Sequence, residues 1–137
     1  MTPFDLAFKF KGLAEIKGEK HNPKILEFFN SIGHKWVQTD ETAWCAAFVN
    51  YCCLNTIKEQ THKLNARSFL TFGFDRKSPM RGDIVVLWRD NPNSWKGHVG
   101  FYIDHDDKWV YMLGGNQNNE VNISRYPVER VLSYRRV

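Results

Sequence analysis

The sequence lacks any long apolar run, and this absence excludes a membrane-spanning helix. No stretch approaches the roughly 18–20 consecutive apolar residues that a transmembrane helix needs. Residues 1–20 carry charges throughout, so they have neither the apolar segment nor the small-residue cleavage site of a secretory signal. We therefore expect no stable membrane insertion, and synthesis in the cytoplasm without a signal peptide.

Cysteine is also scarce, because the 137 residues contain only Cys45, Cys52 and Cys53. An odd and small number of cysteines does not build a disulfide framework. If Cys45 and Cys52 share a helix, they lie about 10.5 Å apart along its axis, beyond the about 7 Å between Cα atoms that a disulfide allows. We therefore expect free thiols, with one available for chemistry. A zinc site is the weakest alternative, because the chain has no C-x-x-C pair.

The net charge of the chain is small as well. The 19 basic and 15 acidic residues are scattered and leave a net charge of +4. This mild surplus favours anionic partners, but it is too weak to indicate nucleic acid. The sequence has no repeat, low-complexity tract or Gly/Ser linker, and its 42% hydrophobic content can form a core. We predict a single domain over residues 1–137.

The spacing of apolar residues changes near residue 78. Before this point, helical spacing predicts helices over residues 3–15, 24–32, 41–58 and 65–72. After it, alternation predicts strands over residues 84–88, 98–104, 109–113, 121–126 and 131–135. Helices followed by an antiparallel sheet are typical of the α+β class. The segment 41–58 is apolar around most of its circumference, which indicates a buried central helix capped by Asp40 or Thr42.

Cys45 is the candidate nucleophile. A thiol reacts as thiolate, and a helix N-terminus or a neighbouring imidazolium lowers its pKa from about 8.5. Cys45 falls in the first turn of the predicted central helix, whereas Cys52 and Cys53 lie two turns further in. We expect these two to be buried small hydrophobic residues. On position alone, a structural role for Cys45 stays equally open.

His98 is the candidate base, because an imidazole pKa near 6.5 suits proton transfer at neutral pH. It begins a predicted strand directly after Gly97, whereas the other four histidines fall in polar turns or connectors. Asn116 is the candidate third residue, since the hairpin after His98 brings residues 114–117 back beside it and Asn can orient an imidazole. Gly114 and Gly115 would let the backbone pass close to the site. A structural histidine and an ordinary Gly-Asn turn remain open alternatives.

The chain resembles the CHAP group of cysteine- and histidine-dependent cell-wall hydrolases and their NlpC-type relatives. The similar segments are EIKGEKHNPKILEFF (15–29), ETAWCAAFVNYC (41–52), PMRGDIVVLW (79–88), GHVGFY (97–102) and LGGNQNNEVNISRYP (113–127). The resemblance implies a papain-like fold with the catalytic cysteine at the N-terminus of the central helix. It implies hydrolysis of amide bonds in the peptidoglycan stem peptide, as an amidase or an endopeptidase, with no metal or cofactor.

Carried over residue by residue, the resemblance implies Cys45 as nucleophile, His98 as general base and acid, and Asn116 as the residue that orients His98. Members often have Glu two positions before that Asn, where this chain has Gly114. The papain-type oxyanion glutamine would fall at position 39, but Gln38 is one residue off, so the Cys45 backbone N–H is the expected donor. Asp83 is interpreted as a structural turn residue.

Trp44 and Trp95 flank these residues in the sequence and are expected to bind substrate as cleft walls, with a core role equally open for Trp44. The expected partner is bacterial peptidoglycan, met in the periplasm or cell wall after release or delivery by a secretion system, and the expected state is a monomer. Two alternatives remain open. One is an interbacterial toxin of the same fold, neutralised by an immunity or inhibitor protein, and the other is an inactive cell-wall-binding module.

Overall fold

The computed structural model describes residues 1–16, 21–35 and 43–137, which form the predicted α+β architecture. The helices are α1 (Pro3–Lys9), α2 (Pro23–Ser31), α3 (Cys45–Leu54) and the 3₁₀ helices η1 (Ala66–Thr71) and η2 (Val128–Arg130). The strands are β1 (Phe74–Arg76), β2 (Ile84–Trp88), β3 (Gly97–His105), β4 (Trp109–Gln117), β5 (Glu120–Pro127) and β6 (Val131–Arg136). No helix in the described ranges is long and apolar enough to cross a bilayer.

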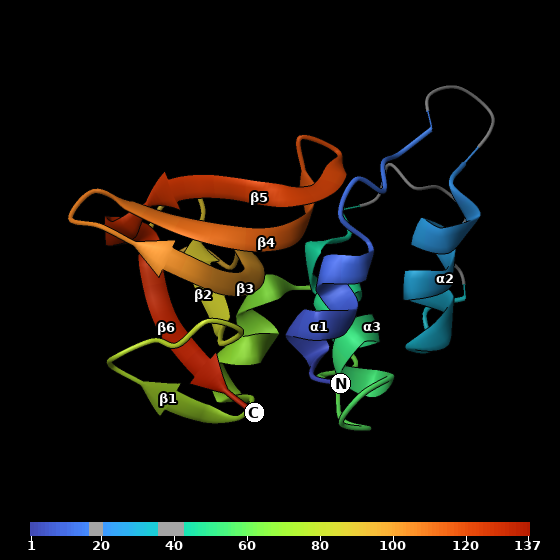
Figure 1. Ribbon diagram of the computed structural model, residues 1–137, viewed down its shortest axis with the longest axis horizontal. Helices are drawn as coiled ribbons and strands as arrows, with labels where there is room; N and C mark the ends of the chain where they lie inside the picture. Colours follow the sequence, from blue (N-terminus) through green and yellow to red (C-terminus); the bar gives the residue numbers. More distant parts are fainter. Residues whose placement is uncertain (17–20, 36–42) are drawn as a thin grey trace.

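The six strands form one antiparallel sheet in the order β1-β6-β2-β3-β4-β5. Helices α1, α2 and α3 gather on one side of this sheet (Figure 1). The predicted strand over 84–88 has the observed bounds, and the other four predicted strands are present but longer. Strand β1 was not predicted, because its three exposed residues show no alternation of buried and exposed positions.

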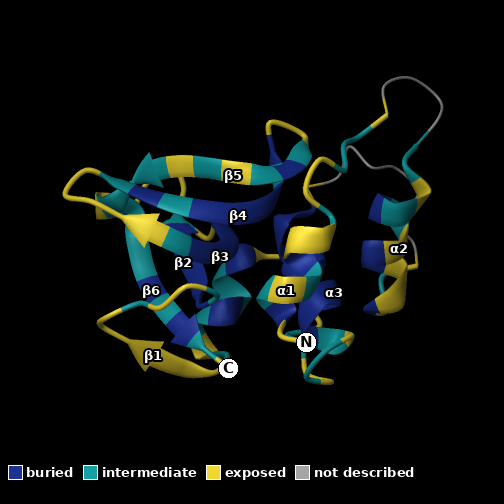
Figure 2. Cartoon of the chain, viewed as in Figure 1, coloured by how far each residue is buried: buried dark blue, intermediate teal, exposed yellow. Residues whose placement is uncertain are grey.

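Helix α3 is the central helix, and its first nine residues are all buried (Figure 2). It packs on β3 and β4 and is covered by α1 and α2. The helix begins at Cys45, later than the predicted start, and ends at Leu54. Residues 36–42, which contain the expected caps Asp40 and Thr42, lie outside the described residues. The residue at the N-cap is Trp44, which makes no capping hydrogen bond with its side chain.

Helix α1 ends at Lys9, well before the predicted Glu15. The backbone beyond it leaves the helix and pairs with the β5 hairpin instead. Gly12 donates to the carbonyl of Val121 at 2.8 Å, and Val121 donates to the carbonyl of Leu13 at 2.8 Å. The sequence spacing could not show this, because the partner strand lies more than a hundred residues further along the chain.

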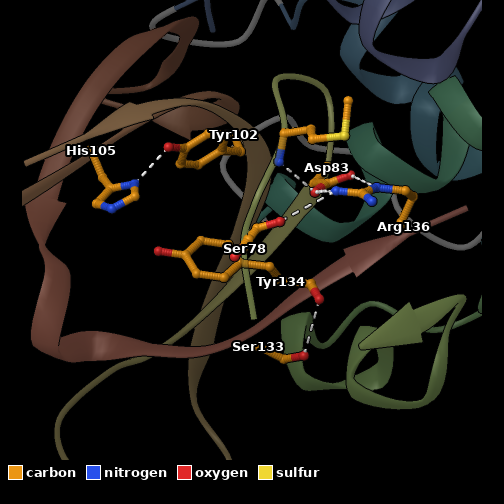
Figure 3. Close-up of polar contacts among 8 residues, drawn as sticks. Ser78, Asp83, Tyr102, His105, Ser133, Tyr134 and Arg136 are labelled. Carbon is orange, nitrogen blue, oxygen red and sulfur yellow. Dashed lines mark hydrogen bonds and ion pairs between the residues drawn. The ribbon is translucent and has the colours of Figure 1, made fainter. Parts of the chain in front are cut away.

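Asp83 ties the turn before β2 to the last strand. Its carboxylate accepts hydrogen bonds from Arg136 Nε at 2.9 Å, from Arg136 Nη2 at 2.8 Å and from the backbone N–H of Met80 at 2.8 Å (Figure 3). The side chain is only 5% exposed, and these three donors compensate for its burial. The contacts agree with the interpretation of Asp83 as a structural turn residue.

Candidate active site

A pocket of about 130 Å³ brings the first residue of α3 together with the start of β3. Cys45 and His98 both line it and are only 7% and 8% exposed. The two side chains face the same pocket and each shifts the pKa of the other. The remaining lining residues come from the chain before α3, from η1 and the segment preceding it, from the β2–β3 connection and from β4: Ala43, Leu64, Asn65, Ala66, Arg89, Trp95, Lys96, Gly97 and Asn116.

The surroundings of Cys45 favour the thiolate. Burial raises the pKa of the Cys45 thiol, but the neighbouring imidazole of His98 outweighs it, and the backbone N–H groups of Val99 and Ala46 lower the pKa further. The net result is a pKa below that of a free cysteine. Because Cys45 stands at the first position of α3, the helix dipole acts in the same direction.

His98 is shifted in the complementary direction. Burial lowers the pKa of its imidazole, but the hydrogen bond and negative charge of Cys45 and a hydrogen bond to Gln117 outweigh burial and the charge of Arg89. The net pKa lies above the ordinary value for histidine. A lowered thiol pKa and a raised imidazole pKa together favour a thiolate–imidazolium pair.

Gln117 fixes which nitrogen of His98 faces the sulfur. Its Oε1 lies 2.9 Å from His98 Nε2, while its own Nε2 donates to the carbonyl oxygens of Asn122 at 2.8 Å and Met112 at 3.3 Å. The amide oxygen can only accept, so His98 Nε2 must carry the proton that it donates. This leaves Nδ1 as the ring nitrogen for Cys45, as proton transfer with the thiol requires.

Gln117, rather than Asn116, therefore holds the position beside His98, and the prediction for Asn116 is corrected here. The register of the β4–β5 pair shifts between Gly114 and Gln117, and Asn116 adopts a positive φ of 57°. Such a bulge changes which side chain faces each side of the strand. Asn116 consequently lines the pocket, while the Gln117 side chain is buried against the imidazole.

The two glycines before Asn116 make room for this arrangement. A Cβ atom on Gly114 would lie 2.5 Å from Gln117 Oε1, and one on Gly115 would lie 2.6 Å from the Trp44 ring. The close backbone approach predicted from these glycines is therefore present. At Gly114, where the resembled group often has Glu, the side chain of Gln117 occupies the space that a side chain would need.

Asn122 and Tyr126 complete the surroundings of His98 and were not predicted from the sequence. Asn122 Oδ1 accepts from Gln117 Nε2 at 3.0 Å and from the Ser124 hydroxyl at 2.6 Å, which fixes the amide orientation of Gln117. The Tyr126 hydroxyl lies 3.3 Å from His98 Nε2. Burial raises the pKa of Tyr126 to about 12, and the charge of Cys45 adds to this, so the hydroxyl stays neutral. The sequence signal that could have identified these residues is the alternation along β5, which places residues 122, 124 and 126 on one face.

The two tryptophans have different environments. Trp95 is 73% exposed and lines the pocket, as expected for a cleft wall. Trp44 is fully buried, contacts the rings of Phe28 and Phe48, and donates its indole N–H to Glu15 at 3.1 Å. The expectation of a substrate-binding role for Trp44 is therefore wrong, and the core role that stood beside it is the observed one.

We predict that Trp44→Ala lowers the free energy of unfolding by about 3–5 kcal/mol, because it removes a fully buried ring and leaves a cavity. Trp95→Ala, the matched control, should leave stability within about 0.5 kcal/mol of the parent, since that ring faces solvent. Chemical denaturation of both variants checks the prediction. Equal stabilities for the two would contradict the core placement of Trp44.

The other thiols and histidines have surroundings that differ from the pocket. All three cysteines are free and buried. Burial raises the pKa of Cys53 to about 12 and that of Cys52 well above its ordinary value, so neither forms a thiolate near neutral pH. His98 is the one histidine lining the pocket, although the structure describes all five. Within residues 1–16, 21–35 and 43–137, no three His, Cys, Asp or Glu side chains are grouped to hold a metal ion.

The model of the CHAP domain family matches residues 37–116, more than half of the 137 residues. The chain therefore belongs to the CHAP family, whose domain is papain-like and whose members generally act as hydrolases on peptidoglycan. The matched range contains Cys45 and His98 and ends one residue before Gln117. No curated protein matches the chain significantly. The positions Gln38 and Thr39, considered for an oxyanion side chain, lie outside the described residues.

Proposed function

We propose that the chain is a peptidoglycan hydrolase that cleaves an amide bond of the stem peptide through Cys45. The observation that carries the proposal is the pair of Cys45, at the start of α3, and His98, at the start of β3, in one pocket, with pKa shifts that favour thiolate and imidazolium. Membership of the CHAP family indicates peptidoglycan as the substrate. An intact pair in an accessible pocket favours an enzyme over an inactive binding module.

In the proposed mechanism, the Cys45 thiolate attacks the carbonyl carbon of the amide and forms a tetrahedral oxyanion. His98 Nδ1–H then protonates the leaving amine, so that the C–N bond breaks and a thioester with Cys45 remains. Neutral His98 next takes a proton from water, whose oxygen attacks the thioester. The acyl group leaves as a carboxylic acid, and the thiolate–imidazolium pair is restored.

The backbone at the start of α3 is the proposed source of oxyanion stabilisation. The first N–H groups of a helix have no partner within the helix, and the Trp44 side chain does not cap them. The Cys45 N–H belongs to this group and sits on the nucleophile itself. We therefore assign it as an oxyanion donor, which places positive charge where negative charge develops in the reaction.

We propose that Trp95 binds substrate. It lies on the β2–β3 connection, which forms the rim of the pocket and is held in place by Arg67. The guanidinium of Arg67 donates to three carbonyl oxygens of the β2–β3 connection: Lys96 at 2.8 Å, Pro92 at 2.9 Å and Asn91 at 3.1 Å. These bonds fix the segment that carries Trp95 over the pocket. A rigid exposed ring suits contact with the apolar faces of a glycopeptide at low entropic cost.

Digestion of purified sacculi, followed by mass spectrometry of the released fragments, tests the proposal. Cleavage at the lactyl link would release a peptide with a new N-terminal alanine and define an amidase. Cleavage within the stem or cross-bridge would define an endopeptidase. Intact sacculi after prolonged incubation with folded enzyme would refute the proposed function.

We predict a bell-shaped dependence of kcat/KM on pH. The acid limb reports deprotonation of Cys45, and its lowered pKa places that limb below the value of about 8.5 for a free thiol. The alkaline limb reports deprotonation of His98, and its raised pKa places that limb above about 6.5. Initial rates on a soluble muropeptide across the pH range check both limbs. A single ascending limb centred near the pKa of an ordinary thiol would contradict the ion pair.

A further inference from the structure

Arg89 is a cation on the rim of the pocket, and no carboxylate among the described residues pairs with it. It directly follows β2, is exposed, and lines the pocket together with Cys45 and His98. Its guanidinium forms no ion pair or hydrogen bond with the side chains that the structure describes. Lys96, the other cation of the lining, differs, because its Nζ lies 3.1 Å from Asp90 Oδ2.

The backbone of Arg89 is held by the same contacts that fix the β2–β3 connection. Its backbone N–H donates to the carbonyl of Lys96 at 3.3 Å and closes the β2–β3 connection. The Lys96 carbonyl is in turn held by Arg67 Nε at 2.8 Å. The Arg89 side chain therefore extends from a restrained backbone, which lowers the entropic cost of binding a ligand.

Arg89 also acts on His98 in a direction that opposes catalysis by the free enzyme. Its positive charge lowers the pKa of His98, against the effects of Cys45 and Gln117. An anion bound at Arg89 would cancel this effect and favour the imidazolium.

We propose that Arg89 binds a free carboxylate of the stem peptide next to the scissile amide and so selects substrates in which this group is not amidated. A guanidinium presents paired N–H donors that match the two oxygens of a carboxylate. The proposal deepens the proposed function and rests on it, since it concerns the substrate that Cys45 cleaves.

The test uses a set of synthetic stem peptides in which each carboxylate in turn is converted to a carboxamide. For one of them, amidation should lower kcat/KM of the parent enzyme about tenfold, mainly through KM, as expected for one charge-assisted hydrogen bond near solvent. In Arg89→Gln the same amidation should change kcat/KM less than about twofold. Arg125→Gln removes one exposed charge that stacks on Trp109 outside the pocket, and it should keep the parental preference.

The split between KM and kcat separates binding from the electrostatic effect on His98. Lost binding of the carboxylate raises KM, whereas a changed pKa of His98 moves the alkaline limb of the pH profile. Equal preferences in the parent and Arg89→Gln, with Cys45-dependent cleavage intact, would overturn the role of Arg89 alone. Absence of cleavage of every peptide and of sacculi would instead overturn the proposed function, and the inference with it.

Discussion

Cys45→Ala should abolish hydrolysis of peptidoglycan, with kcat falling by about four to six orders of magnitude while the fold is kept. The Cys45 sulfur is the atom that forms the acyl-enzyme, and the described residues that line the pocket include no second nucleophile of comparable strength. Alanine removes only the sulfur and its interaction with His98. Release of muropeptides from sacculi and the thermal unfolding midpoint, measured together, check the prediction.

Cys52→Ala is the matched control. Cys52 lies in the same helix and is fully buried outside the pocket, with a pKa well above its ordinary value. Its variant should retain the parental rate, and iodoacetamide should inactivate the parent and Cys52→Ala alike by alkylating Cys45. Release of the same fragments by Cys45→Ala at an undiminished rate would show that Cys45 is not the nucleophile.

The elements that carry the nucleophile and the base could be predicted because their signals are local. A continuous apolar stretch beginning near Cys45 indicates a buried helix, and the alternation of Val99, Phe101 and Ile103 indicates a strand after Gly97. The structure then places Cys45 and His98 in one pocket. Helix ends were less predictable, because α1 is stopped by pairing with residues of β5 that are distant in sequence.

The third member of the site could not be predicted from the same kind of signal. Asn116 and Gln117 are adjacent, and a shift of one position in a strand moves a side chain to the opposite face. The bulge between Gly114 and Gln117 decides between them, and it depends on the positive φ of Asn116 and on the space above Gly114. Trp44 is a similar case, because its burial follows from the packing of α2 on α3 rather than from its place beside Cys45.

Gln117→Leu should lower kcat by about two to three orders of magnitude, because an imidazole that loses its orienting partner no longer presents the correct nitrogen to the nucleophile. The variant removes the oxygen that accepts from His98 Nε2 and leaves only the Tyr126 hydroxyl at 3.3 Å. It also removes the hydrogen bond that raises the pKa of His98, so the alkaline limb of the pH profile should move to lower pH. Steady-state kinetics across the pH range measure both effects.

The shift of the alkaline limb distinguishes a positioning role from simple loss of stability, since partial unfolding lowers the rate equally at every pH. Gln60→Leu is the matched control: Gln60 lies outside the active-site pocket, and its buried Oε1 has no hydrogen-bond partner among the described residues. That variant should keep the parental profile and unfold at the same or a higher temperature. A folded Gln117→Leu enzyme with parental kcat and an unmoved alkaline limb would mean that Tyr126 and the packing around the ring suffice to orient His98.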